Sequence, residues 1–439
     1  MIFSYSSCGR KLSKVLRQRL LDSFEGDASL YTRMKFALIS HILPPSASGQ
    51  AMLIYRLLKD FDPDSYCLIS GPDYDIGASS YNASHALPSK YHYYPHTEFF
   101  KRGTRFGLAK WREAVNILPS VISRARHIAK IIKSEKCDAV ISFTGDVLNL
   151  PAGYLASKLV DVPFYAYVCD YYSYREWENP LVRYVAQRLE PLLLRRAAGI
   201  VTLNSFMCDE LRRRYGVEAV VIHNPCDLSK YEEVPPAPAS KQGDEVSITY
   251  TGAIYDAHFD AFRNLLQAIK LLNRANIKLH LYTVSSPLEL AAKGIAGPVV
   301  YHEQESASAM PGIQKQSDIL FLPLAFTSPY PAVIRTSAPF KMGEFLAARR
   351  PILVHAPSDS FLSWYFRQHE CGLVVDKSDP EKLAQAIGHI LSDAELQQRL
   401  SANAWQQAQS DFSISTAQAK FAELLKLEMP SRFCELLKS

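Results

Sequence analysis

Short apolar runs alternate with amphipathic segments along most of this chain of 439 residues. Between the apolar runs, residues 51–59, 150–160 and 206–215 show helical periodicity. Buried strands separated by helices are typical of a parallel sheet with crossover helices. The apolar runs of the first half are Met34–Ser40, Tyr66–Ser70, Ala139–Phe143, Phe164–Cys169, Gly199–Leu203 and Val220–His223. They predict an α/β domain over residues 34–227.

The same alternation starts again after a stretch rich in proline and acidic residues. That stretch, 228–245, contains Pro235, Pro236 and Pro238 and reads as an interdomain linker. The later apolar runs are Val246–Gly252, Leu279–Val284, Val299–His302, Ile319–Pro323, Pro351–Val354 and Leu373–Val375. We therefore predict a second α/β domain over 246–412 and a final helical segment over 413–439. We expect residues 1–33 to form a basic N-terminal arm outside either core.

Composition narrows the class of protein without naming a function. Apolar residues make up 48% and charged residues 21% of the chain, as in globular proteins. The net charge of +5 is too modest to indicate nucleic acid as a partner. The eight cysteines show no zinc-ligand spacing, and reduced thiols in the cytoplasm are the simplest reading. No apolar run is long enough to predict a transmembrane helix, and no signal peptide is predicted.

The segment 337–355 carries the strongest candidate chemistry. Lys341 and Glu344 stand three residues apart near the start of a predicted helix, so both can project from one face. Ser337 precedes them, and helix starts favour negative charge. A lysine there suits a nucleotide diphosphate, and a carboxylate accepts hydrogen bonds from a ribose diol. A solvated lysine–glutamate pair would have the same spacing.

This segment resembles the donor-site helix of retaining, nucleotide-sugar-dependent glycosyltransferases of family 4. In that family a K-x-x-E-[FY]-L-A helix follows the donor loop, and its glutamate meets the donor ribose. The matching residues here are Lys341, Glu344, Phe345, Leu346 and Ala347. The resemblance implies the GT-B fold: two tandem Rossmann-like, doubly wound domains with an interdomain cleft. It also implies that the C-terminal helix packs back on the first domain.

Three further segments extend the resemblance. Residues 196–227 resemble the family's run into the interdomain boundary. The loop closing at Gly49 and Gln50 corresponds to the acceptor-side loop, and Gly252 corresponds to the glycine that lies close to the donor diphosphate. Without the resemblance, Gly49 would read equally well as an ordinary turn glycine.

Asp170 and two departures from the family pattern bear on catalysis. Asp170 follows a strand where many relatives place a histidine beside the reacting sugar, with Cys169 at the histidine position. It can orient a sugar hydroxyl or accept the acceptor proton, or it can cap a turn. Thr336 stands where many members have a second glutamate, and residues 253–262 lack the usual basic pair. Arg335 and Lys341 are therefore the candidate diphosphate partners and catalytic groups.

Metal chemistry is weakly indicated. Asp62 and Asp64 form one D-x-D pattern, in a polar loop before a strand. Asp73 and Asp75 form another, which follows a strand in the first domain and lies away from the expected donor site. The resemblance implies a metal-independent enzyme in which helix ends and basic side chains stabilise the leaving group. We therefore expect no metal and no cofactor besides the donor substrate. Three histidines share a region that we read as an acceptor-side loop rather than a ligand set: His85, His92 and His96.

A basic segment suggests a second partner. Residues 101–136 hold ten lysines or arginines and two glutamates. A helical stripe of Val121, Ala125, Ile128 and Ile132 is expected to be buried, with Arg126, Lys130 and Lys133 on the outer face. Such a face is either simply solvated or meets an anionic membrane surface or polyanionic acceptor.

Together these observations predict a cytoplasmic glycosyltransferase, peripheral at the inner membrane face if the basic face is used. It would transfer a sugar from a nucleotide sugar to a glycan or lipid-linked acceptor with retention, in the manner of polysaccharide biosynthesis. Two alternatives remain open: a non-catalytic relative that binds a sugar nucleotide, and a nucleotide-sugar epimerase of the same architecture.

Overall fold

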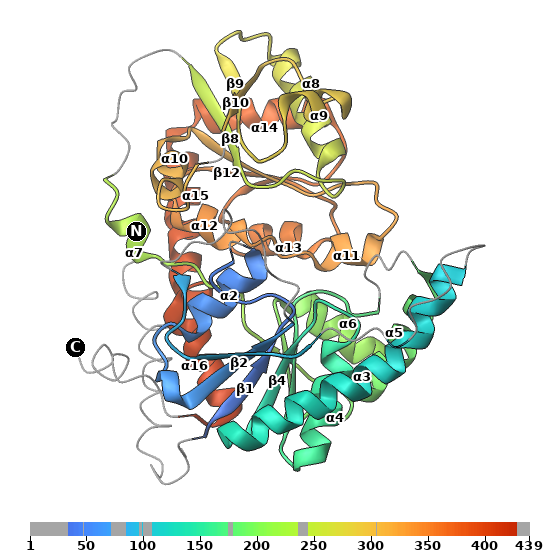
Figure 1. Cartoon of the computed structure of the whole chain (residues 1–439). Helices are drawn as coiled ribbons and strands as arrows, with labels where there is room; N and C mark the ends of the chain where they lie inside the picture. Colours follow the sequence, from blue (N-terminus) through green and yellow to red (C-terminus); the bar gives the residue numbers. More distant parts are fainter. Residues whose placement is uncertain are drawn as a thin grey trace.

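The computed structural model describes residues 34–46, 48–71, 85–95, 99, 108–173, 179–235, 245–303 and 305–427. These residues form two wholly parallel sheets, one above the other in Figure 1, with helices on both faces of each. The predicted fold class is thereby confirmed. The predicted arm 1–33 and the last part of 413–439 lie outside the described residues. None of the described helices is both long and apolar enough to cross a membrane.

The first sheet has the strand order β3-β2-β1-β4-β5-β6-β7. One face packs against α3, α4 and α5, and the other against α2 and α16. The strands are β1 (Phe36–Ile39), β2 (Tyr66–Ser70), β3 (Lys90–Tyr93), β4 (Ala139–Phe143), β5 (Phe164–Val168), β6 (Gly199–Thr202) and β7 (Val220–Val221). The helices are α2 (Gly49–Leu58), η2 (Pro63–Ser65), α3 (Leu108–Glu135), α4 (Asn149–Val160), α5 (Pro180–Leu194), α6 (Ser205–Tyr215) and α7 (Ser229–Glu232).

The second sheet has the strand order β10-β9-β8-β11-β12-β13. Its faces pack against α8, α9 and α14 on one side and α12, α13 and α15 on the other. The strands are β8 (Val246–Thr251), β9 (Ile277–Tyr282), β10 (Val299–His302), β11 (Ile319–Pro323), β12 (Ile352–His355) and β13 (Leu373–Val375). The helices are α8 (Phe259–Leu272), α9 (Pro287–Ala292), α10 (Met310–Gln316), α11 (Pro331–Thr336), α12 (Lys341–Ala347), α13 (Phe361–Gln368), α14 (Pro380–Ser392), α15 (Ala394–Asp411) and α16 (Ile414–Leu425).

The chain passes between the two sheets twice, and both crossings lie side by side. The Cys226 amide donates to the Phe412 carbonyl at 2.6 Å, and Cys226 forms an isolated parallel β-bridge with Ser413. Beyond this point α16 returns to the first sheet, where the Phe421 ring meets Phe36 at 5.7 Å and Phe61 at 6.0 Å. The first domain is therefore completed by the last described helix, with α11, α12 and α13 lying between the sheets (Figure 1).

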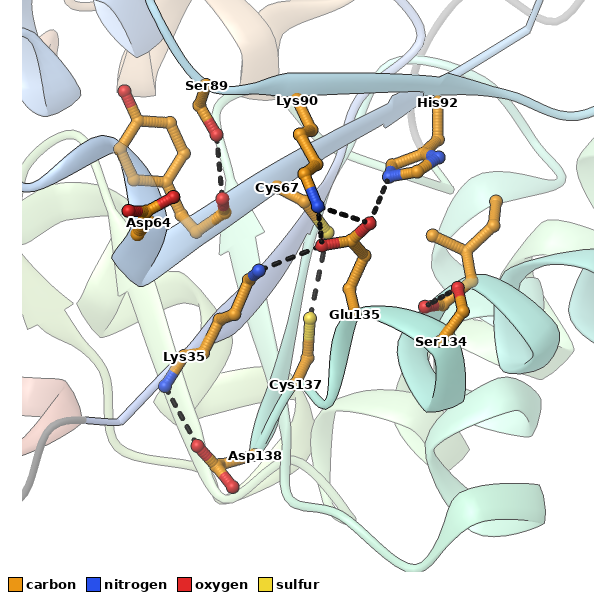
Figure 2. A network of polar contacts seen from close by, with 12 residues as sticks. Lys35, Asp64, Cys67, Ser89, Lys90, His92, Ser134, Glu135, Cys137 and Asp138 are labelled. Carbon is orange, nitrogen blue, oxygen red and sulfur yellow. Dashed lines mark hydrogen bonds and ion pairs between the residues drawn. The ribbon is translucent and has the colours of Figure 1, made fainter.

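A charged network closes the amino-terminal edge of the first sheet, at the end remote from the loops that follow the strands (Figure 2). Glu135, at the end of α3, accepts from Lys35 at 2.9 Å and Lys90 at 3.1 Å, and pairs with His92 at 3.2 Å. The hydrogen bond from Lys35 is the leading cause that lowers the pKa of Glu135 to about 2. The network ties α3 to β1 and β3.

The strand β3 was not predicted, because its sequence Lys-Tyr-His-Tyr carries no apolar run. It is an edge strand whose side chains are exposed or half-buried, so nothing selects for the alternation that marks a strand. The predicted buried stripe of α3 is confirmed: its four members are buried, and Arg126, Lys130 and Lys133 are exposed.

Candidate active site between the two sheets

The loop after β8 brings together Gly252 and Lys341, two residues that the sequence placed at the donor diphosphate. Gly252 has φ +121°, a conformation that side-chain-bearing residues rarely adopt. A Cβ atom there would lie 2.8 Å from Nζ of Lys341. Glycine is therefore needed both for the backbone turn and for the close approach of the ammonium group.

The ammonium group of Lys341 has an unusual environment. It donates to the hydroxyl of Tyr250 and lies 3.8 Å from the centroid of the same ring, a cation–π contact. Burial lowers the pKa of Lys341 to about 7, with the charge of Glu344 acting in the opposite direction. Within the described part of the chain, no carboxylate forms an ion pair with Lys341. A buried cation of this kind is electrostatically suited to an anionic ligand.

Glu344, the predicted ribose partner, lies at the boundary between the domains. Its Oε1 accepts from Nη2 of Arg56, on α2 of the first domain, at 3.0 Å. The second arm of Arg56 donates to the Pro225 carbonyl at 2.8 Å, and its guanidinium lies 4.8 Å from the ring centroid of Phe340. No described group bonds Oε2 of Glu344. Arg56 thus fixes one carboxylate oxygen and leaves the other available for a diol.

Arg335, the other predicted phosphate partner, also meets the first domain. Its Nη1 lies 3.6 Å from Oε2 of Glu210, and its guanidinium is 5.9 Å from the ring centroid of Phe206. Among the described contacts, none joins Arg335 to Lys341 or Gly252, so the predicted cations do not share one contact point. Its side chain is 48% exposed, so it remains accessible to a ligand.

The position that lacks the family's second glutamate is structurally occupied. Thr336 is buried; its hydroxyl donates to the Ala332 carbonyl at 3.0 Å, and its own carbonyl accepts from Asn204 of the first domain at 2.8 Å. Ser337, expected before the donor helix, does precede it, as the C-cap of α11; α12 begins after Phe340 without a side-chain cap. α12 spans Lys341–Ala347, the same seven residues that match the K-x-x-E-[FY]-L-A pattern.

The first domain contributes the loop after β5. The Thr144 hydroxyl accepts from the amides of Cys169 at 3.0 Å and Asp170 at 3.3 Å. Tyr255 belongs to the loop between β8 and α8. Its pKa is raised mainly by burial and secondly by the negative charge of Asp170. The charge of Asp170 therefore acts on the donor-side loop across the domain boundary. The neighbouring thiol of Cys169 has a pKa raised well above its usual value by burial.

Gly49 and Gln50 open α2 beside the same boundary. The Cβ position of Gly49 lies 3.8 Å from the Phe340 ring of the second domain. The amide of Gln50 donates to the Ser40 hydroxyl and to the Thr144 carbonyl, both at 3.1 Å. Gln50 thus ties together the loops after β1 and β4, which supports a positioning role for this residue.

Among the described residues, potential metal ligands do not converge. Asp62 caps the short helix η2. His92 is paired with Glu135 at the amino-terminal edge of the first sheet, away from the loops that follow the strands (Figure 2). His85 packs against the Tyr55 ring at 4.8 Å. In the described ranges, no group of three or more histidine, cysteine or acidic side chains is placed to hold a metal ion. Three predicted candidates lie outside those ranges: Asp73, Asp75 and His96.

Several site residues were missed in the sequence. Tyr250, Arg56 and His258 all lie within this region, on β8, on α2 and at the start of α8. Tyr250 and Arg56 look like ordinary core and helix-surface residues in their local sequence, since their partners are 91 and 288 positions away. The absence of arginine and lysine from 253–262 was the one available signal that another group, such as His258, was needed there.

The two parallel sheets, joined by a double crossing and meeting at the loops that follow their strands, define a GT-B fold. Residues 93–230 match the family Glycosyltransferase Family 4, and residues 245–393 match the family Glycosyl transferases group 1. The chain is therefore a retaining-type glycosyltransferase of family 4, with the group 1 domain second. No curated protein matches the sequence significantly.

Solved structures agree with this fold at low sequence identity. The Anabaena protein HepE, in complex with UDP and glucose, has a TM-score of 0.62 at 15% identity, over 89% of this chain and 99% of its own. A glycosyltransferase from Rickettsia africae has a TM-score of 0.60 at 14% identity, over 91% and 100%. A putative UDP-N-acetylglucosamine 2-epimerase from Listeria monocytogenes has a TM-score of 0.56 at 11% identity, over 91% and 99%. At such identities the likeness concerns the fold alone, which this epimerase also shares.

Proposed function

We propose that this glycosyltransferase binds a nucleotide sugar mainly on its second domain and an acceptor on its first, and transfers the sugar with retention. The observation that carries the proposal is the enclosed ammonium of Lys341 beside Gly252. This ammonium has no carboxylate partner among the described residues, and it lies in the loop region where the family resemblance places the diphosphate. The complex of HepE with UDP and glucose supports the choice of ligand class.

In this proposal the leaving diphosphate gains negative charge as the glycosidic bond breaks. Lys341 stabilises that charge, with Arg335 approaching from its present contact with Glu210. Glu344, held by Arg56, accepts from the ribose. Asp170 orients an acceptor or sugar hydroxyl from the first domain. Gly49 and Gln50 line the acceptor side.

The donor can be tested without knowing the acceptor. The full chain is incubated with isotope-labelled UDP-, GDP-, ADP-, CDP- and dTDP-sugars, and transfer or slow donor hydrolysis is measured. Turnover of at least one donor is expected, with loss of that turnover in Lys341→Met. Conversion of a donor to its epimer would favour the epimerase alternative. Binding of a donor without any turnover would favour a non-catalytic relative, for which the missing glutamate at Thr336 is the specific argument.

The acceptor is proposed to be a glycan or a lipid-linked sugar at an anionic membrane. The outer face of α3 supports this, because exposed apolar residues in the first part of the helix are followed, on the same side, by exposed basic residues. Trp111, Val115 and Leu118 are 62%, 50% and 67% exposed. At about 100° per residue, they share a side with the exposed basic group of Arg126, Lys130 and Lys133. An exposed tryptophan followed by cations suits peripheral contact with a lipid surface.

A further inference from the structure

His258 occupies an unexpected position at the start of α8. Its side chain is buried, with 3% of the residue exposed, between the rings of Tyr255 at 4.3 Å and Tyr250 at 5.9 Å. Its Nδ1 atom has no hydrogen-bond partner among the described residues. A buried polar nitrogen without a partner is costly, and such groups in folded proteins require an explanation.

His258 also shares its surroundings with Lys341. Burial, and secondly the positive charge of Lys341, lower the pKa of His258 to about 3, so its imidazole is neutral near pH 7. Both side chains border the loop between Gly252 and α8, and Lys341 contacts Tyr250, the ring that also borders His258. One cation and one neutral imidazole thus meet there without a described carboxylate bonded to either.

The start of α8 adds a third contribution. This helix has 14 residues, and His258 at its N-cap makes no side-chain cap bond. The first amides of a helix point outward and favour negative charge. Asp260 stands in the first turn, but its Oδ2 accepts from the amides of Phe326 and Thr327, both at 2.9 Å, and so holds the loop after β11.

We propose that His258 and Lys341 together bind the diphosphate of the nucleotide-sugar donor, with His258 replacing the basic pair that residues 253–262 lack. The assignment rests on the proposed function, since it names a second partner for the same diphosphate. A protonated ring nitrogen of the neutral imidazole donates to a phosphate oxygen. The cost of burying the unpartnered nitrogen is then recovered only when the donor is bound.

This arrangement predicts proton uptake on binding. A diphosphate beside Lys341 favours the charged ammonium, whose pKa of about 7 leaves it roughly half protonated at pH 7. The acidic and titratable groups nearby are Glu344 on α12, Asp256, Tyr255 and Asp260 on the loop and α8, and Asp170 from the first domain. Among them, Glu344 and Asp260 already accept bonds from Arg56 and from backbone amides.

The test uses the full chain and two probes, inorganic pyrophosphate and UDP, in calorimetric titrations at pH 6.5–8.5. The variants are His258→Leu, which removes the donor, and His258→Asn, whose amide nitrogen lies near the position of Nδ1. His355→Asn is the matched control, because His355 is a buried histidine of the same domain that already bonds the Val375 carbonyl at 2.9 Å.

We expect His258→Leu to weaken pyrophosphate and UDP binding about ten- to a hundred-fold, the range for a lost hydrogen bond to a charged group. His258→Asn should restore most of the affinity, and His355→Asn should leave it unchanged. At pH 7.5 the wild-type protein should take up protons, measured as a binding enthalpy that depends on the buffer. Thermal unfolding without ligand shows whether each variant is folded.

Two results separate the claims. If the wild-type protein binds UDP and His258→Leu binds it equally well, the assignment of His258 is refuted while the proposed function stands. If the wild-type protein binds neither pyrophosphate nor UDP, and turns over no sugar of the donor panel, the proposed function itself is refuted.

Discussion

Replacing Lys341 with methionine should stabilise the protein without ligand and abolish donor binding. The pKa of Lys341 is lowered from 10.5 to about 7 by burial. At about 1.36 kcal/mol for each tenfold change in proton affinity, keeping the ammonium in this place costs roughly 4 kcal/mol at pH 7. Methionine removes that cost but also loses the contacts with Tyr250, worth about 1–2 kcal/mol. A net gain of about 2 kcal/mol in the free energy of unfolding is expected.

The gain should depend on pH in a defined direction. Between pH 7 and 10.5 the unfolded state holds more protons on Lys341 than the folded state does, so the wild-type protein gains stability as pH rises through this window. Below pH 7 the full cost of the charge is present. The advantage of Lys341→Met should therefore be largest at or below pH 7 and shrink toward pH 10.

Urea denaturation at pH 6, 7 and 9 measures the free energy of unfolding of both proteins. UDP at about 100 times its dissociation constant should raise the free energy of unfolding of the wild-type protein by about 2.7 kcal/mol and leave that of the variant unchanged. Lys315→Met is the matched control. The Lys315 ammonium donates to the Tyr231 carbonyl at 2.6 Å and to the Val234 carbonyl, so its loss should destabilise by about 1–3 kcal/mol. A less stable Lys341→Met, or one that keeps its affinity for UDP, would refute the reasoning.

Four further outcomes are expected. Glu344→Gln should weaken nucleotide-sugar binding in calorimetry with little change in stability, because glutamine keeps an oxygen for Arg56 but accepts diol hydrogen bonds less well; unchanged affinity would exclude the ribose role. Arg335→Ala should lose catalytic rate by ~10²-fold, and full turnover would place the phosphate partner elsewhere. In Glu135→Gln the free energy of unfolding should fall less steeply between pH 4.5 and pH 2. The pKa of Glu135 is about 2 in the folded protein and 4.5 in the unfolded chain, so its carboxylate contributes stability that is present above pH 4.5 and lost toward pH 2. Flotation with acidic liposomes at low salt should be largely abolished, and binding to neutral liposomes unaffected, when glutamine replaces Arg126, Lys130 and Lys133.

The alternation of strands and helices was predictable because fully buried strands must be apolar. β2, β4 and β10 begin and end where the sequence places them, and β1 differs only by its outer residues. The edge strand β3 was not predictable, since its exposed side chains carry no such constraint. The helix α12 coincides with the motif Lys341–Ala347, although no side-chain cap marks its start.

The candidate site was predictable only where a residue's own sequence context identifies it. Gly252 and Lys341 were each identified from their own sequence contexts, and the structure places them together. The ion pair between Glu344 and Arg56 joins residues 288 positions apart, and no local pattern encodes it. His258 has only the negative signal that its loop lacks basic residues. Contacts across the domain boundary are thus the part that the sequence alone does not reveal.

The most direct test is the stereochemistry of sugar release from a turned-over donor. The full chain is incubated with the nucleotide sugar that shows turnover, and proton NMR records the anomeric form of the first product before mutarotation. The account predicts a product with the same anomeric configuration as the donor, formed by the wild-type protein and lost in Lys341→Met. An inverted product, or equal turnover by Lys341→Met, would contradict it.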